Sequence, residues 1–143
     1  MATTRRRHER GQSLVEFSLA LIVFLMLLMG VFDFGRGIYM YNGVAQAARE
    51  LARVTSVHPG TTLGASPQTA AVLDTQRAMI PGLGTPTYSC VDIAGAAVTG
   101  SCLADNFVEV RIVAPYTPIT PLLGLVGTLN LQSTSTVAIQ SYP

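Results

Sequence analysis

The sequence has little of what enzymes and metal proteins need. Only 12% of its 143 residues are charged, and it contains two histidines and two cysteines. A metal site needs several such ligands close together, but His8 and His58 are far apart in the chain, with no cysteine beside either. The aspartates are scattered singly: Asp33, Asp74, Asp92 and Asp105. Serine and threonine hydroxyls without a neighbouring base are not nucleophiles. We therefore expect no metal, no cofactor and no catalytic residues, which disfavours a membrane-anchored enzyme.

What the sequence does have is one long apolar stretch at residues 11–32, GQSLVEFSLALIVFLMLLMGVF. Sixteen residues from Phe17 to Phe32 carry no charge, and a start at Leu14 makes nineteen with Glu16 included. Nineteen helical residues span about 28 Å, close to the ~30 Å hydrocarbon core of a bilayer. The stretch is too long and too basic at its entrance for a buried core helix. A cleaved secretory signal is disfavoured because no small-residue cleavage site follows. The sequence thus predicts a transmembrane helix at residues 12–33.

The charges predict the orientation of this helix. Residues 1–11 carry four arginines and one glutamate, a net charge of +3, whereas the remainder has five arginines and seven acids, a net charge of −2. Basic residues beside a membrane helix tend to stay in the cytoplasm. We therefore expect a single-pass protein of the inner membrane with a cytoplasmic N-terminus and an extracytoplasmic C-terminal domain. A basic arm that binds nucleic acid is the alternative for residues 1–11, and the rest of the chain has no basic patch for it.

Glu16 is unusual in such a helix, because a carboxylate at the centre of a membrane helix costs about 2–3 kcal/mol, and less near the interface. It lies five positions after Gly11 and just before Phe17, with arginines upstream. A basic leader, a glycine, a spaced Glu-Phe pair and the start of an apolar helix together resemble the processing site of type IV prepilins, specifically those of tight-adherence (Tad, or Flp) pili. The resemblance implies that a prepilin peptidase cuts between Gly11 and Gln12.

The resemblance also implies a role for Glu16 after cleavage. The new amine of Gln12 in one subunit would pair with Glu16 of the next and set the register between them. An ion pair in an apolar setting is stronger than one at a surface, and an unpaired carboxylate there costs several kcal/mol. The alternative is that Glu16 simply reaches the membrane surface and has no partner.

The helix is predicted to continue beyond the membrane as an amphipathic segment, residues 34–57. Proline disfavours helix in the residue before it, so the helix should stop near Ser56, shortly before Pro59. Glu50 and Arg53 are spaced for an ion pair. The glycines at 30, 35, 37 and 43 either make the helix bendable or make room for neighbours. One predicted stripe faces the outer domain, with spacings of three and four: Phe34, Ile38, Tyr41, Ala45, Ala48 and Ala52.

The same segment, DFGRGIYMYNGVAQAARELARVTS, resembles TadE-like pseudopilins in its acidic-aromatic-glycine-arginine step and its later Ala-Ala-Arg-Glu run. The C-terminal stretch from Pro115 to Thr136 has the look of the end of such proteins as well. Residues 57–105 carry no such resemblance.

Residues 58–143 are predicted to form a small extracytoplasmic α+β domain with an antiparallel sheet, against which the long helix packs. Ser66 and Pro67 open a short helix that runs to about Ile80, with an apolar face supplied by Ala70, Ala71, Val72, Leu73, Met79 and Ile80. Strands are predicted at residues 87–92, 107–113 and 128–139. In the second, Val108, Val110 and Ile112 share one face. Prolines at 115, 118 and 121 mark a connection between the last two strands.

The two cysteines, Cys90 and Cys102, both fall on the side predicted to be extracytoplasmic. An even pair in an oxidising compartment indicates a disulfide. Closing this loop of about 13 residues would add about 3 kcal/mol in the chain-entropy model. Two unpaired structural cysteines are the alternative.

These features predict a membrane-inserted, prepilin-like structural subunit, most similar to a TadE-type minor pilin or pseudopilin that acts in assembly of a Tad pilus and in adhesion. Its expected partners are a prepilin peptidase, other pilin subunits, the pilus assembly platform in the membrane and membrane lipid, with no nucleic acid. The alternative is an uncleaved single-pass protein whose outer domain binds a partner.

Overall fold

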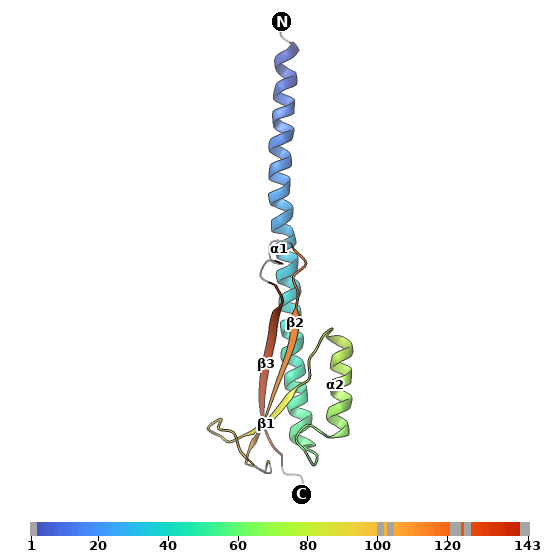
Figure 1. Cartoon of the computed structure of the whole chain (residues 1–143), viewed down its shortest axis with the longest axis vertical. Coiled ribbons are helices and arrows are strands. Elements are labelled where there is room, and N and C mark those ends of the chain that lie inside the picture. The colour runs from blue at the N-terminus through green and yellow to red at the C-terminus, as the bar shows by residue number, and fades with distance from the viewer. Residues whose placement is uncertain (1–2, 100–101, 103–104, 121–123, 125–126, 141–143) are drawn as a thin grey trace.

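The computed structural model describes residues 3–99, 102, 105–120, 124 and 127–140. Within these residues the elements follow in the order α1 (Thr3–Val57), α2 (Pro67–Met79), β1 (Thr87–Val91), β2 (Phe107–Tyr116) and β3 (Leu129–Ala138). Figure 1 shows α1 as the long axis of the molecule, with its N-terminal half standing clear and its C-terminal half against the sheet. The predicted α+β architecture, a long helix packed on a small antiparallel sheet, is confirmed.

Helix α1 is one unbroken element of 55 residues, or about 80 Å. It ends one residue after the predicted stop, where the His58 N–H still donates to the Val54 carbonyl at 2.9 Å. Its apolar segment has a mean hydropathy of 2.6 and none of it is buried within the protein. A core helix of a soluble domain would be mostly buried, so this helix is long, apolar and exposed enough to cross a membrane. Its length and composition alone would also fit a signal sequence.

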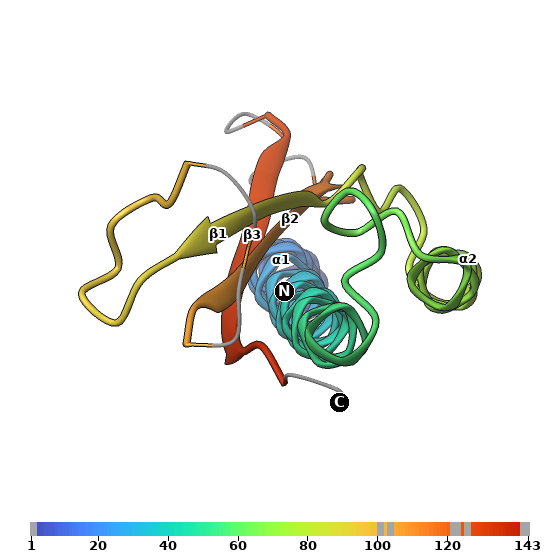
Figure 2. The ribbon, with the colours of Figure 1, turned by 90° about the horizontal axis from the view of Figure 1, so that it is seen from below.

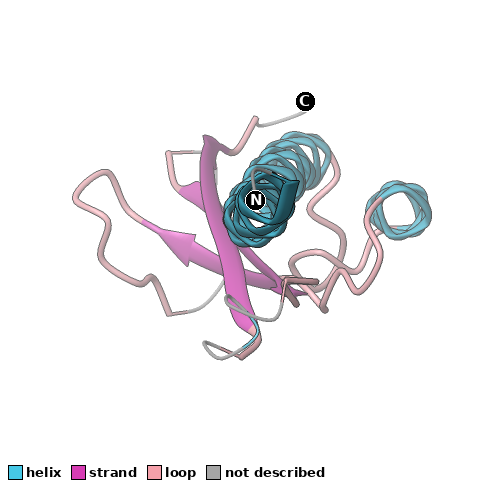
Figure 3. Cartoon of the chain, turned by 90° about the horizontal axis from the view of Figure 1, so that it is seen from above, coloured by secondary structure: helices cyan, strands magenta, loops and turns pink. Residues whose placement is uncertain are grey.

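The sheet is antiparallel with the order β1-β2-β3, so β2 is central. Val108, Val110 and Ile112 of β2 are fully buried on one face, as predicted. This face packs on α1, where alanines and one leucine let the helix approach closely; the helical side of the core consists of Val44, Ala47, Ala48, Leu51 and Ala52. Seen along α1, the helix crosses one face of the sheet and α2 stands beside it, away from the strands (Figures 2 and 3).

The buried face of α1 differs from the predicted stripe. Phe34, Ile38 and Tyr41 are 70%, 46% and 51% exposed. The buried or half-buried positions lie one residue earlier at each step: Asp33, Gly37, Met40, Val44, Ala47 and Leu51. One residue turns a helix face by about 100°. The prediction was wrong for Phe34, Ile38 and Tyr41 because it followed large apolar side chains, whereas the first contacts with the domain are made by an aspartate and a glycine. Ala48 and Ala52 are buried as predicted, because the alanine-rich part of α1 is covered over a wide arc.

The four glycines between residues 30 and 43 of α1 divide into two pairs. A Cβ at residue 37 would lie 3.7 Å from the Tyr116 ring, and one at residue 43 would lie 3.4 Å from Ile80. A Cβ at residue 30 or 35 would meet nothing within 4 Å. Glycine therefore permits close packing at the two docked positions, and the helix is regular through all four.

Helix α2 starts as predicted but docks differently. Ser66 is its N-cap, accepting a hydrogen bond from the Thr69 N–H at 3.2 Å, and Pro67 is its first residue. Ala70, Ala71 and Met79 of the predicted apolar face are exposed; Val72 and Leu73 are half-buried, and Ile80 is buried. Part of the contact with α1 is polar instead: the Thr69 hydroxyl lies 3.3 Å from that of Thr55 and 2.8 Å from that of Ser66, all buried. Periodicity of apolar residues cannot register such a contact.

Pro115 lies inside β2 and not in the following connection, which corrects the prediction. Strand β1 pairs only with residues 107–111 of β2, so the second half of β2 has a strand partner on one side only. The carbonyl of Val113 accepts from the Gly84 N–H at 2.8 Å on the other side. Alternate residues of a strand direct their polar groups to the same edge, so the nitrogen of Pro115 also faces that edge and breaks no ladder bond.

Candidate functional site

The residues predicted from the sequence to form a processing site lie on the free half of α1. Gly11, Gln12, Glu16 and Phe17 are all exposed, and a Cβ on Gly11 would meet nothing within 4 Å. Gln12 and Glu16 are one turn apart on the same helix face, about 6 Å along the axis. This segment is therefore accessible from all sides within one subunit.

A second site lies where α1 meets the outer domain, and we call it the Asp33 clasp: Asp33 with Tyr116, Ile119 and Thr120. Asp33 is only 4% exposed. Its carboxylate accepts from the Thr120 hydroxyl at 2.6 Å, from the Thr120 N–H at 2.8 Å, and from the Ile119 N–H at 3.1 Å to each oxygen. The Tyr116 hydroxyl donates to the Asp33 carbonyl at 2.7 Å. The clasp ties the segment after β2 to the helix across more than eighty residues of sequence.

The donors explain how a carboxylate can be buried here. A buried charge without partners costs several kcal/mol, whereas hydrogen bonds to a charged acceptor are among the strongest in proteins. Arg36 adds positive charge nearby, its guanidinium carbon 5.3 Å from the centre of the Tyr116 ring. Burial, and then the charge of Asp33, raise the pKa of Tyr116, so its hydroxyl stays protonated and donates at physiological pH.

An open groove of about 420 Å³ runs beside the clasp. Apart from Asp33 its lining is mostly apolar: Phe34, Gly37, Ile38, Tyr41, Tyr116, Pro118, Leu129 and Leu131. The groove lies between α1 and the first residues of the edge strand β3. The apolar residues that the predicted stripe assigned to packing against the domain, Phe34, Ile38 and Tyr41, form one wall of this groove.

Sequence reasoning missed the clasp. In the sequence Asp33 is one of several isolated aspartates, although a carboxylate directly after an apolar span is costly unless it has partners. That cost indicates that the Asp33 carboxylate has hydrogen-bond donors elsewhere in the chain. Its partners, Ile119 and Thr120, could not be found from sequence, because two of the four donors are backbone N–H groups that any residue but proline carries.

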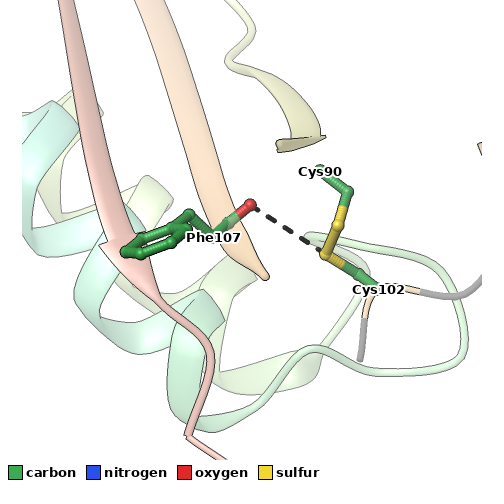
Figure 4. Close-up of a disulfide and its surroundings, with 3 residues drawn as sticks. All are labelled: Cys90, Cys102 and Phe107. Carbon is green, nitrogen blue, oxygen red and sulfur yellow. Dashed lines mark hydrogen bonds between the residues drawn. A yellow bond between two sulfur atoms is a disulfide. The ribbon is translucent and has the colours of Figure 1, made fainter. Parts of the chain in front are cut away.

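The two cysteines form a disulfide, with their Cα atoms 5.7 Å apart, within the usual range. It links β1 to the connection before β2, and the Cys102 sulfur lies 4.0 Å from the Phe107 carbonyl oxygen (Figure 4). Cys90 pairs with Val108 at the start of β2, whereas Tyr116 of the clasp ends that strand. The disulfide and the clasp therefore hold opposite ends of the sheet.

Two further observations concern charged side chains. Glu50 and Arg53 form an exposed ion pair at 2.7 Å, as predicted, and Arg53 lowers the pKa of Glu50. Among the residues that the structure describes, no group of three His, Cys, Asp or Glu side chains is placed to hold a metal ion.

A family model described as TadE-like protein matches residues 11–53. This segment begins at Gly11, includes Glu16 and Asp33, and ends four residues before the end of α1. Neither the curated proteins nor the solved structures gave a match. The match confirms the resemblance to TadE-like proteins over the long helix, and with the exposed apolar segment it indicates a membrane protein related to Tad pili.

Proposed function

We propose that this chain is a prepilin-like structural subunit of a Tad pilus, a TadE-type minor pilin or pseudopilin that acts in pilus assembly and adhesion and is not an enzyme. The observation that carries the proposal is the construction of α1. One unbroken helix joins an exposed apolar half to a half docked on a small sheet, and the TadE-like match lies on this same helix. Such a helix can hold a folded domain at a fixed distance from a membrane.

In this proposal residues 1–11 are a cytoplasmic leader, 12–33 cross the inner membrane, 34–57 carry the helix onto the domain, and 58–143 form the outer domain. The disulfide supports an extracytoplasmic domain, since disulfides persist in oxidising compartments. The partners are a prepilin peptidase, other pilin subunits and the assembly platform in the membrane.

The first test is the mature N-terminus. We expect intact-mass measurement of the membrane-extracted protein to show a chain that begins at Gln12. Gly11→Ala should block cleavage, because the peptidase must approach the residue before the scissile bond closely.

Gly30→Ala is the matched control, because residue 30 lies on the same exposed helix and a Cβ there also meets nothing within 4 Å. It should leave cleavage unchanged. A chain that retains residues 1–11 in pilus-forming cells would refute the processing step and support the uncleaved membrane protein as the alternative.

The second test concerns register between subunits. In one chain Gln12 and Glu16 are one turn apart, so the amine of the same subunit can compete for the carboxylate. The proposal is that a neighbouring subunit displaced along the filament brings its own amine against Glu16. Glu16→Gln should leave insertion, cleavage and the disulfide intact and reduce co-purification with other pilus subunits by about tenfold or more, the effect of losing ~1.4 kcal/mol.

Ser18→Ala is the control for polarity in the same part of the helix. The Ser18 hydroxyl donates to the Val15 carbonyl of its own helix at 2.8 Å, so its loss should not affect assembly. If Glu16→Gln assembles and adheres like the wild type, Glu16 has no role in register.

A further inference from the structure

The Asp33 clasp determines the height of the domain above the membrane span. The Ile119 N–H donates to both oxygens of Asp33 at 3.1 Å, so the backbone of Ile119 lies beside residue 33 of α1. Asp33 directly follows Phe32, the last residue of the apolar run. This end of the domain therefore lies at the level where α1 leaves the hydrocarbon core.

The side chains at this level are apolar and exposed. Ile119 is 76% exposed although its backbone is held in the clasp. We call these side chains the foot of the domain: Phe34, Ile38, Tyr39, Tyr41, Ile119 and Leu129, all exposed. Most of them surround the apolar groove described above. A soluble domain rarely leaves so many large apolar side chains uncovered in one place.

The foot fits the interfacial layer of a bilayer by length and by composition. Leu14 to Tyr41 are 28 residues, which span about 42 Å as a helix, close to the ~40–45 Å of a bilayer with its headgroup regions. Tyrosines are enriched in that layer, where Tyr39 and Tyr41 would lie. Arg36 lies three residues before Tyr39, and its guanidinium over the Tyr116 ring places a positive charge at the height expected for lipid phosphates.

We propose that the foot is embedded in the headgroup and upper acyl layer of the outer leaflet, and that the lipid surface covers the apolar groove. The inference rests on the membrane span of the proposed function. Lipid is favoured over a second copy because Tyr39 and Tyr41, two residues apart, lie on nearly opposite sides of α1 and are both exposed. A bilayer surrounds the helix at this height, whereas one protein partner would cover one side.

Single tryptophans can test this depth, because the chain contains none of its own. The full chain is reconstituted into phosphatidylcholine vesicles with bromine at shallow or deep acyl positions. Three variants are compared: Ile119→Trp in the foot, Phe24→Trp in the span, and Ile93→Trp as control. Ile93 is 90% exposed and follows β1 at the opposite end of the sheet. Cooperative denaturant unfolding with the wild-type midpoint confirms that each variant is folded.

A side chain inserted ~5–10 Å into the headgroup–acyl boundary should be quenched at least about twofold by shallow bromines and less by deep ones. We expect this for Ile119→Trp, quenching by deep bromines for Phe24→Trp, and none for Ile93→Trp. Leu129→Trp, on the other side of the groove, should behave like Ile119→Trp.

The outcomes separate this inference from the proposed function. If Phe24→Trp is quenched and Ile119→Trp is no more quenched than Ile93→Trp, the foot is outside the lipid and the inference is wrong, while the span stands. If Phe24→Trp is not quenched either, the span and the proposed function fail as well. A blue shift of Ile119→Trp that grows with protein density, without quenching, would assign the groove to a second copy and overturn the lipid partner.

Discussion

Asp33→Ala is expected to lower the free energy of unfolding of the outer domain by about 2–4 kcal/mol. The substitution removes the acceptor for two backbone N–H groups and one hydroxyl, and it leaves the Thr120 hydroxyl and N–H buried without a partner. Some of this loss is offset because a buried charge is also removed. The Tyr116 hydroxyl keeps its bond to the residue 33 carbonyl, so the end of β2 should stay in place while residues 119 and 120 detach.

The measurement is denaturant unfolding of the full chain in detergent, followed by near-ultraviolet circular dichroism, together with amide exchange. Amide exchange at Ile119 and Thr120, which follow β2, should be accelerated more than exchange within β2 itself. Asp74→Ala is the control, because the Asp74 side chain is 79% exposed and its ion pair with Arg77 is long, at 3.9 Å. This substitution should change the free energy of unfolding by less than about 0.5 kcal/mol. Equal effects of the two substitutions would show that the clasp does not stabilise the domain.

Loss of the disulfide is the second large effect. Changing both Cys90 and Cys102 to serine should lower the free energy of unfolding by about 3 kcal/mol, because a closed loop of about 13 residues then becomes free in the unfolded chain. The clasp and the disulfide lie about 30 Å apart along β2. Their effects on stability should therefore add when both are removed.

Alkylation tests the bond itself and the side of the membrane. In native extracts of the wild type, both thiols should resist alkylation and react after reduction. The single variant Cys90→Ser leaves one free thiol at Cys102, which is half-buried whereas Cys90 is buried. A membrane-impermeant maleimide added to spheroplasts should label this thiol if the domain is outside. Ready labelling of both wild-type thiols without reduction would contradict the disulfide, and protection of the single thiol until lysis would contradict the orientation.

The helices and strands of this protein, and the class of protein it resembles, could be predicted from local sequence patterns. Sixteen uncharged residues after an arginine cluster predict a membrane helix whatever else the chain does, because insertion depends on local length and polarity. Ser66-Pro67 and the alternation Val108, Val110, Ile112 likewise act over a few neighbours, and both are as predicted. The disulfide could be anticipated because only two cysteines exist.

The side of α1 that faces the sheet could not be predicted, because it depends on contacts between distant parts of the chain. The choice depends on Asp33 and Gly37, whose contacts come from Tyr116, Ile119 and Thr120 more than seventy residues later. Neither contact involves a large apolar side chain of α1: Asp33 is held by backbone N–H groups, and Gly37 lies under an aromatic ring. The spacing of apolar residues therefore cannot predict them. They turned the helix by one residue from the predicted face, and that turn exposes Phe34, Ile38 and Tyr41 at the level where the helix leaves the membrane. Long-range hydrogen bonds, and not hydrophobic periodicity, therefore set the position of the domain on its helix.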